Sequence, residues 1–294
     1  MPALLTKVKS TLFIVARRKT WALLDGEYAS VFRGRSLDYD DLREYVPGDE
    51  VRDIDWKATA RRGAPLVKRY VASRRQSVLL VVDTGRGMAA RTGSGEPKSE
   101  VAITACGMLG YLALRHGDTV GLVEGDEAGT RPHQSKGSEA HLERLLRVIE
   151  RHTTLQADRS HLHDQLRYIA DHYRQRMLLL VVTDDHEMSA ADEVLIRRLH
   201  AQHEILWLTV EDADPTSDGP GEDAYDVGDD AVLPPEVRFD ARLRTAYASA
   251  VRARRESAER TLDQLAIVHA RVGSTDAVMG TVFRLLERQR RRAR

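Results

Sequence analysis

Two apolar, β-branched segments that each end in an aspartate constrain the fold of this 294-residue chain more than any other feature. The first covers residues 76–83 and ends in Asp83, and the second covers residues 176–184 and ends in Asp184. A short segment that is apolar throughout is typical of a strand buried on both faces of a parallel sheet. We therefore expect Asp83 and Asp184 at the carboxyl ends of two such strands.

The remaining pattern alternates weaker strand signals with amphipathic helices. Strands are predicted at 118–124, 205–210 and 266–272, and helices at 99–116, 138–152, 161–173 and 190–203. This alternation predicts βαβ units with right-handed crossovers. The expected fold class is α/β, a doubly wound and mostly parallel sheet with helices on both faces. Sites in such sheets lie at the carboxyl ends of the strands, where both aspartates stand.

Composition excludes several classes of function. The chain has 45 basic and 45 acidic residues, so no global field draws it to nucleic acid or to a membrane. The arginine-rich end, 288–294, has no interleaved aromatic residue, and we expect no nucleic-acid binding. The apolar segment 12–16 is too short to span a membrane, so a cytoplasmic protein without stable membrane insertion is predicted. The single cysteine, Cys106, lies in an apolar helical segment and is interpreted as an inert, packed thiol.

A second informative segment, residues 37–61, combines many charges with a Pro-Gly turn and a tryptophan, and it is too polar for a core element. Its residues resemble the signature of the domain-of-unknown-function-58 family, approximately R-x-Y-x-P-G-D-D-x-R-x-I-D-W-x-x-T-A-R. The matching residues are Arg43, Tyr45, Pro47, Gly48, Asp49, Arg52, Ile54, Asp55, Trp56, Thr59, Ala60 and Arg61. Glu50 replaces the second aspartate of the pattern. In that family the signature precedes a von Willebrand factor A-like domain.

The resemblance implies a non-enzymatic adaptor. Relatives are often encoded beside a MoxR-type AAA+ ATPase and are thought to help it act on client proteins or insert metal into them. It thus implies such an ATPase and its clients as partners. We interpret the signature as a partner-binding platform next to the carboxyl edge of the sheet, because tryptophan and arginine are enriched at interface hot spots. A structural interpretation stays open, in which Arg43, Asp49, Arg52, Asp53 and Asp55 pair around the Pro47-Gly48 turn, with Trp56 as an apolar anchor.

The predicted organisation has two parts. Residues 1–75 form an amino-terminal region with the signature, and residues 76–294 form the von Willebrand A-like domain. Within the second part, an acidic loop is expected at 211–232, followed by helices at 242–264 and 276–290. Residues 211–230 contain nine acidic residues and no lysine or arginine. This composition predicts an exposed connection, and a docking site for a basic partner is the alternative.

The resemblance also raises the question of a metal. Von Willebrand A domains that bind a divalent ion use a metal-ion-dependent adhesion site, D-x-S-x-S, with a threonine and an aspartate from later loops. Here Asp83 is followed by Gly85 and Gly87, which supply no ligand, so the site is degenerate. The glycines are interpreted as permitting a tight turn.

Asp83 and Asp184 remain as metal ligands, with candidate hydroxyls at Thr84, Thr183 and Ser189. Near the expected second loop the hydroxyls are those of Thr130, Ser135 and Ser138. We expect no cofactor, and weakly held Mg²⁺ or Mn²⁺ is the alternative, because this set falls short of an oxygen-only shell. Arg86 is a further candidate, as a cation that neutralises Asp83.

Catalytic patterns are absent from the sequence. It has no Gly-x-Ser-x-Gly elbow, no spacing that suggests a catalytic triad and no phosphate-binding loop. His161 and His163 alternate on a helix and diverge, and His200 and His203 stand at a helix end, where the dipole stabilises a cation. We therefore expect no enzyme. The alternative is a metal-dependent hydrolase or phosphatase that uses Asp83 and Asp184.

Overall fold

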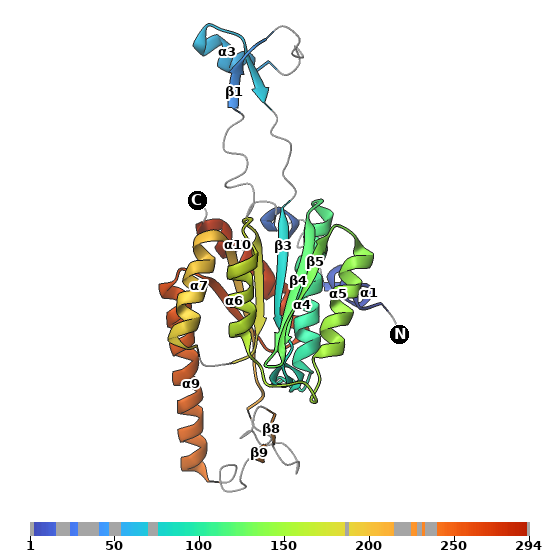
Figure 1. Ribbon diagram of the computed structural model, residues 1–294, viewed down its shortest axis with the longest axis vertical. Coiled ribbons are helices and arrows are strands. Elements are labelled where there is room, and N and C mark those ends of the chain that lie inside the picture. Colours follow the sequence, from blue (N-terminus) through green and yellow to red (C-terminus); the bar gives the residue numbers. More distant parts are fainter. Residues whose placement is uncertain are drawn as a thin grey trace.

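A six-stranded sheet forms the centre of the protein (Figure 1). The computed structural model describes residues 3–15, 24–28, 41–46, 54–69, 76–185, 188–214, 225–227, 231–232 and 240–292. The strand order is β10-β7-β6-β3-β4-β5. The strands are β3 (Ser77–Asp83), β4 (Thr119–Asp126), β5 (Gly129–Lys136), β6 (Leu178–Thr183), β7 (Glu204–Val210) and β10 (Val268–Val272). All pairs are parallel except β4 with β5, which confirms the predicted α/β class and the five predicted strands.

Helices cover both faces of this sheet. On one face lie α1 (Leu4–Val15), α4 (Lys98–Arg115), α5 (Glu139–His152) and α10 (Thr275–Arg292). On the other lie α6 (Leu162–His172), α7 (Ala190–Gln202) and α9 (Ala241–Gln264). Each helix predicted from periodicity is present. In β3, Val78, Leu80 and Val82 face the first layer, while Leu79 and Val81 face the second. Because β3 is buried on both faces, its sequence is apolar throughout.

The edge strand β5 was not predicted. It carries the sequence GTRPHQSK, and most of its residues are exposed or half-buried. An edge strand pairs on one side only, and polar residues and proline there discourage pairing with another chain. The apolar pattern on which strand prediction depends is therefore missing from β5.

The amino-terminal helix α1 was also missed, although Leu5, Val8 and Leu12 are buried against the core. The backbone N–H groups of Leu4 and Leu5 donate to the carboxylate of Glu143 on α5, at 3.0 and 2.7 Å. A carboxylate at a helix amino terminus satisfies N–H groups that have no partner within the helix. The helix α1 therefore packs against the α/β domain and is separate from the signature residues.

The described signature residues, together with the strand that follows them, form a small module, here called the signature module. It consists of β1 (Asp41–Glu44), α3 (Trp56–Arg62) and β2 (Leu66–Arg69), with β1 and β2 antiparallel. Figure 1 shows this module standing apart from the helices and sheet, at the end of the molecule where β3 begins. The sequence placed it next to the carboxyl edge of the sheet, and that expectation was wrong. The module precedes β3 in the chain and lies on the side of the molecule where that strand begins (Figure 1).

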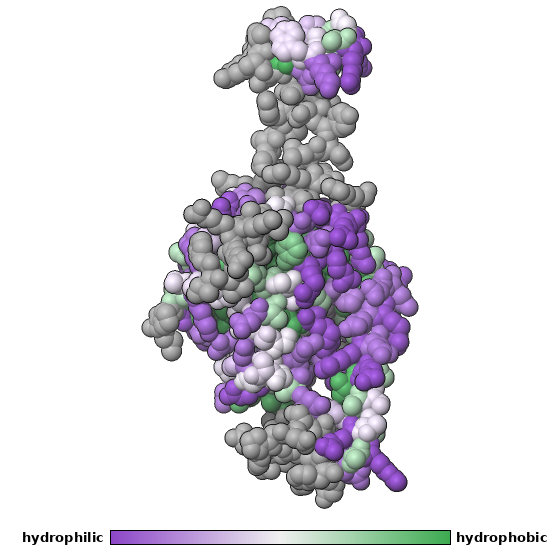
Figure 2. Space-filling model, turned by 180° about the vertical axis from the view of Figure 1, so that it is seen from behind, coloured by the Kyte–Doolittle hydropathy of each residue, from purple (hydrophilic) through white to green (hydrophobic). Residues whose placement is uncertain are grey.

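The helix α9 projects beyond the rest of the domain at the opposite end (Figure 1). Leu262, near its carboxyl end, is its buried residue. Figure 2 shows that the face seen from behind is largely hydrophilic. No helix in the described ranges is both long and apolar enough to cross a membrane.

The two tryptophans Trp207 and Trp56 provide a matched test of the core. Trp207, in β7, is 1% exposed, whereas Trp56, in α3, is 65% exposed. We expect Trp207→Ala to lower the free energy of unfolding by roughly 3 to 5 kcal/mol, because it removes a large buried side chain and leaves a cavity. Trp56→Ala is expected to change it by about 0.5 kcal/mol or less. Denaturant unfolding of both variants checks this, and equal losses would contradict the packing described here.

Candidate functional site

The candidate site lies at the carboxyl edge of the sheet, where β3 and β6 end side by side. Asp83 is the last residue of β3, and Asp184 directly follows β6. These two strands are neighbours, and the chain continues from β3 to β4 on one side and from β6 to β7 on the other. This is a topological switch point, the usual location of sites in α/β sheets. The structure thus brings together the two carboxylates that the sequence singled out.

Asp83 is buried and is 1% exposed. Burial and the negative charge of Asp184 raise the pKa of the Asp83 carboxyl to about 8. The opposing contributions to this pKa are smaller, and they come from the Gly85 N–H, the Ser160 hydroxyl and the charge of Lys98. The Gly85 N–H donates to Asp83 Oδ1 at 2.8 Å. Near neutral pH, therefore, Asp83 is substantially protonated.

Side chains added at Gly85 or Gly87 would collide with neighbouring atoms. A Cβ atom on Gly85 would lie 2.5 Å from the backbone Cα of Ser160, and one on Gly87 would lie 2.5 Å from Asp184 Oδ2. The backbone of Gly85, with φ −64° and ψ 165°, is open to any residue. The expected reason, a tight turn, does not account for Gly85. Glycine there lets the segment before α6 pack directly onto the end of β3.

That segment supplies a hydroxyl that the sequence did not identify. Ser160 precedes α6, and its Oγ atom would lie 2.9 Å from a Cβ on Gly87. Its buried Oγ has no hydrogen-bond partner of good geometry in the described chain, yet it lies near enough to stabilise ionised Asp83. The sequence offered no convincing second-loop hydroxyl, and those nearby are Thr130 and Ser135, which lie on β5, and Ser138, which caps α5. The helices α4 and α5 and the strands β4 and β5 lie between Asp83 and Ser160 in sequence, so local pattern did not reveal this proximity.

Two of the three other candidate hydroxyls are engaged elsewhere. Thr84 Oγ1 donates to Glu124 Oε2 on β4, at 2.8 Å. Ser189 forms a capping box with Asp192 at the start of α7, where its Oγ accepts the Asp192 N–H at 3.1 Å. Thr183 is buried at the end of β6. The hydroxyl that the structure brings to Asp83 is therefore that of Ser160.

Lys98, the first residue of α4, places a cation beside the paired carboxylates, and the neutralising role that the sequence suggested for Arg86 stays a prediction. The Lys98 ammonium lies 3.5 Å from Asp184 Oδ2 and also contacts Asp212. The Lys98 side chain is 1% exposed. Burial raises the pKa of Asp212, and the charge of Lys98 opposes this increase. Asp212 belongs to the start of the acidic loop, so that part of the loop is attached to the sheet edge.

A second ion-pair group stands beside this one. Asp185 accepts from Arg271 Nη1 at 2.6 Å and from Arg255 Nε at 3.0 Å. Burial opposes ionisation of Asp185, but these hydrogen bonds and charges hold the pKa of its carboxyl below the ordinary value. Arg271 also reaches Glu211 at 3.3 Å. Together these pairs connect α9 and β10 to the end of β6.

A third group lies on β4 and β5. The fully buried carboxylate of Glu124 accepts from Arg131 and Thr84, and it contacts His133 at 3.2 Å and His152 at 2.9 Å. With its oxygens so occupied, Glu124 is a structural carboxylate that holds the edge hairpin against α5.

The histidines singled out by the sequence do not converge on one site. His163 Nδ1 lies 2.8 Å from Asp192 Oδ1, whereas His161 pairs with Asp164 at 3.5 Å. Burial and the charge of Arg176 lower the pKa of His203 to about 4, so it is neutral and not the helix-end cation that was expected. Within the described ranges, no group of three or more His, Cys, Asp or Glu side chains is arranged to hold a metal ion. The thiol of Cys106 is buried, which raises its pKa to about 12 and confirms it as inert.

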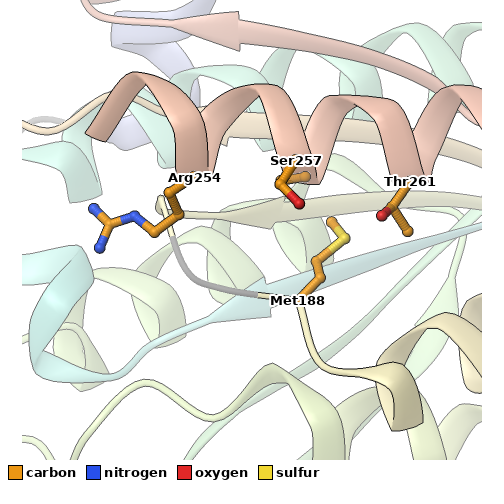
Figure 3. A pocket seen from close by; sticks show the side chains of 5 residues that line it. Met188, Arg254, Ser257 and Thr261 are labelled. Atoms are coloured by element: carbon orange, nitrogen blue, oxygen red, sulfur yellow. The ribbon is translucent and has the colours of Figure 1, made fainter. Parts of the chain in front are cut away.

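A cavity of about 140 Å³ lies between α9 and the segment before α7, lined by Met188, Arg254, Ser257, Ala258 and Thr261 (Figure 3). Pockets that bind drug-sized ligands are typically about 300 to 1,000 Å³. This cavity is too small for such a ligand.

Only some of the signature residues lie in the part of the chain that the structure describes. Arg43 is in β1, Tyr45 follows it, Asp55 caps α3, and Trp56, Thr59 and Arg61 lie on α3. Pro47, Gly48, Asp49, Arg52 and Asp53 lie outside the described residues, as does most of the expected ion-pair network. Trp56 was expected as an apolar anchor in the structural interpretation, but its exposure shows that it does not anchor the module.

Comparison with known proteins identifies related sequences and folds. The profile of the family described as "Protein of unknown function DUF58" matches residues 41–257. Uncharacterized proteins of Mycobacterium tuberculosis (strain H37Rv) and Mycobacterium bovis are each 26% identical over 261 residues, covering 86% of this chain and 79% of theirs. Solved structures that are similar include an aerotolerance-related membrane protein from Bacteroides fragilis, with 12% identity and a TM-score of 0.46 over 72% of this chain and 98% of that one. A von Willebrand factor type A protein from Catenulispora acidiphila has 9% identity and a TM-score of 0.40, over 72% and 42%.

The raised pKa of Asp83 predicts a pH effect on stability. This carboxyl titrates near 3.8 in the unfolded chain and near 8 in the folded protein, so between these values the folded state binds more protons. Its contribution to stability therefore falls as pH rises through this window. Asp83→Asn removes this pH-dependent loss of stability, because asparagine does not titrate. Its side-chain oxygen can still accept the Gly85 N–H. We expect the melting temperature of this variant, relative to the unmodified protein, to increase between about pH 5 and pH 8.

Asp185→Asn is the matched control, because ion pairs lower the pKa of Asp185. This variant should have a lower melting temperature than the unmodified protein at both pH values. A difference between Asp83→Asn and the unmodified protein that does not vary with pH would contradict the burial assigned to Asp83.

Proposed function

The chain belongs to the DUF58 family, and from this premise we propose that it is a non-enzymatic adaptor that contacts a protein partner through the signature module. One observation carries the proposal: Trp56 lies on the surface of α3, with 65% of it exposed. Val46, which follows β1, is 56% exposed. Tryptophan is one of the residue types enriched among interface hot spots.

The rest of the module holds α3 in place. Asp55 caps the helix, because its Oδ1 accepts the N–H groups of Lys57 and Ala58, both at 3.0 Å. Thr59 Oγ1 accepts the Leu66 N–H at 3.0 Å and thereby ties α3 to β2. These two signature residues are structural, and they position the neighbouring tryptophan without burying it. The structural and the partner-binding interpretations therefore apply to different residues of one motif.

The exposed charges on α3 indicate the kind of partner surface. Lys57, Arg61 and Arg62 are exposed on α3, which has no acidic residue in its first turn. A complementary surface offers an apolar pocket for the tryptophan ring and acidic groups around it. The partner that the family resemblance implies is a MoxR-type AAA+ ATPase with its clients, and we adopt it here. The adaptor acts in chaperone-like maturation or metal insertion, in the cytoplasm.

A hydrolase or phosphatase that works from Asp83 and Asp184 receives less support. Lys98 lies beside Asp184 and Asp83 is buried, so neither carboxylate is presented to a substrate. The cavity beside α9 is also small for a substrate.

Binding of the purified MoxR-type ATPase from the same genome tests the adaptor proposal. We expect Trp56→Ala to weaken this binding at least about tenfold, since alanine substitution at a hot spot typically costs 2 kcal/mol or more. Val194→Ala is the matched control, because Val194 is 67% exposed but lies on α7. Calorimetry or surface plasmon resonance measures both affinities. Unchanged affinity in Trp56→Ala, or an equal loss in Val194→Ala, would contradict the assigned surface.

A further inference from the structure

We propose that the ammonium group of Lys98 is the permanent counter-cation of Asp184 and Asp212 and occupies the role that a divalent ion fills in domains with a complete adhesion site. The proposal concerns the site around Asp83, Asp184 and Asp212. It is independent of the partner proposed above, because it makes no use of the signature module.

Lys98 is placed to reach the ends of two strands. It is the first residue of α4, the helix that follows the Asp83 loop, so its backbone is fixed close to both strand ends. Its N–H also donates to the Ala90 carbonyl at 2.9 Å, which holds the loop and the helix start together. From there the side chain reaches the two strands β6 and β7, contacting Asp184 after the first and Asp212 after the second.

The side chain of Lys98 is buried. Lys98 is among the largest fully buried side chains in the described residues. An ammonium group removed from water is stable only when acidic groups pair with it. Here the pairing groups are the carboxylates that a metal would otherwise need. Lys98 is therefore built into the edge as its counter-charge.

The oxygen ligands available at this edge do not fit a divalent ion. Mg²⁺ and Mn²⁺ favour about six oxygen ligands. Gly85 and Gly87 supply none, and the space for side chains there is filled by Ser160 and Asp184. A second cation placed on Asp184 would also stand close to the Lys98 ammonium, 3.5 Å from Asp184 Oδ2, and would be repelled by it.

The same ion pair positions the start of the acidic loop. Because Lys98 contacts Asp212, the first residues after β7 are drawn to the sheet edge. A bound metal ion can have an open coordination position that accepts a carboxylate of a partner. A buried ammonium group has no such position. Contacts at this edge are therefore independent of divalent ions.

The test measures thermal unfolding of chelator-treated protein with and without Mn²⁺. We expect no Mn²⁺-dependent change in the melting temperature of the unmodified protein. Lys98→Met should lower the melting temperature, because it leaves Asp184 and Asp212 without their cation. Lys7→Met is the matched control, since Lys7 pairs with Glu100 at 2.8 Å on the surface, and it should change little.

The cost of removing Lys98 should then be relieved in one of two ways. Mn²⁺ at one hundred times its dissociation constant should restore about 5 °C or more if the emptied site accepts the ion. Alternatively, the double variant Lys98→Met with Asp212→Asn should be more stable than Lys98→Met alone, because it removes an unpaired carboxylate. Either result supports the assignment. The double variant also serves if Lys98→Met alone does not fold.

Three results would overturn the proposal. The first is saturable Mn²⁺ binding by the unmodified protein that Asp184→Asn abolishes. The second is a melting temperature of Lys98→Met no lower than that of Lys7→Met. The third is a destabilised Lys98→Met that neither Mn²⁺ nor Asp212→Asn relieves. None of these depends on the ATPase, so failure of this proposal and failure of the adaptor proposal are distinguishable.

Discussion

Negative charge at the carboxyl edge of the sheet is the constraint on which the rest of the structure depends. Asp83, Asp184, Asp185, Glu211 and Asp212 all come from ends of parallel strands, and parallel strands end at one edge. Like charges at such short range destabilise one another unless protons or cations intervene. The protein uses both: the pKa of Asp83 is raised, while Lys98, Arg255 and Arg271 pair with the others. These cations come from α4, α9 and β10, so charge neutralisation also fastens those elements to the edge.

This solution separates two roles that a metal-binding domain combines in one place. In a complete adhesion site, the strand ends hold the ion and the ion holds the partner. Here the strand ends are neutralised internally, and the exposed aromatic residue lies on the signature module at the other end of the molecule (Figure 1). The proposed division is therefore a closed sheet edge that stabilises the domain and a separate surface that binds the partner.

Much of the fold could be predicted from the sequence because it depends on local pattern. Buried parallel strands such as β3 and β6 are apolar throughout, and α5 has Leu142, Leu145, Leu146 and Ile149 at helical spacing. The edge strand β5 lacked this signal because it is polar. Asp83 and Asp184 were found because they directly follow such strands. Lys98 and Ser160 were not, because their proximity to the aspartates arises from packing between segments distant in the chain, which periodicity does not record. Trp56 was recognised, but its exposure was not, since a single aromatic residue in a polar segment fits both an anchor and a surface site.

Hydrogen–deuterium exchange of the protein alone and with the purified MoxR-type ATPase, in the presence of a chelator, tests the central claim most directly. We predict slower exchange of backbone amides in residues 54–69, which include α3 and β2, and unchanged exchange in residues 84–97 and 211–214 at the sheet edge. Protection confined to residues 84–97 and 211–214, and present only when Mg²⁺ replaces the chelator, would contradict it. That result would place a metal-dependent partner site at the ends of the strands.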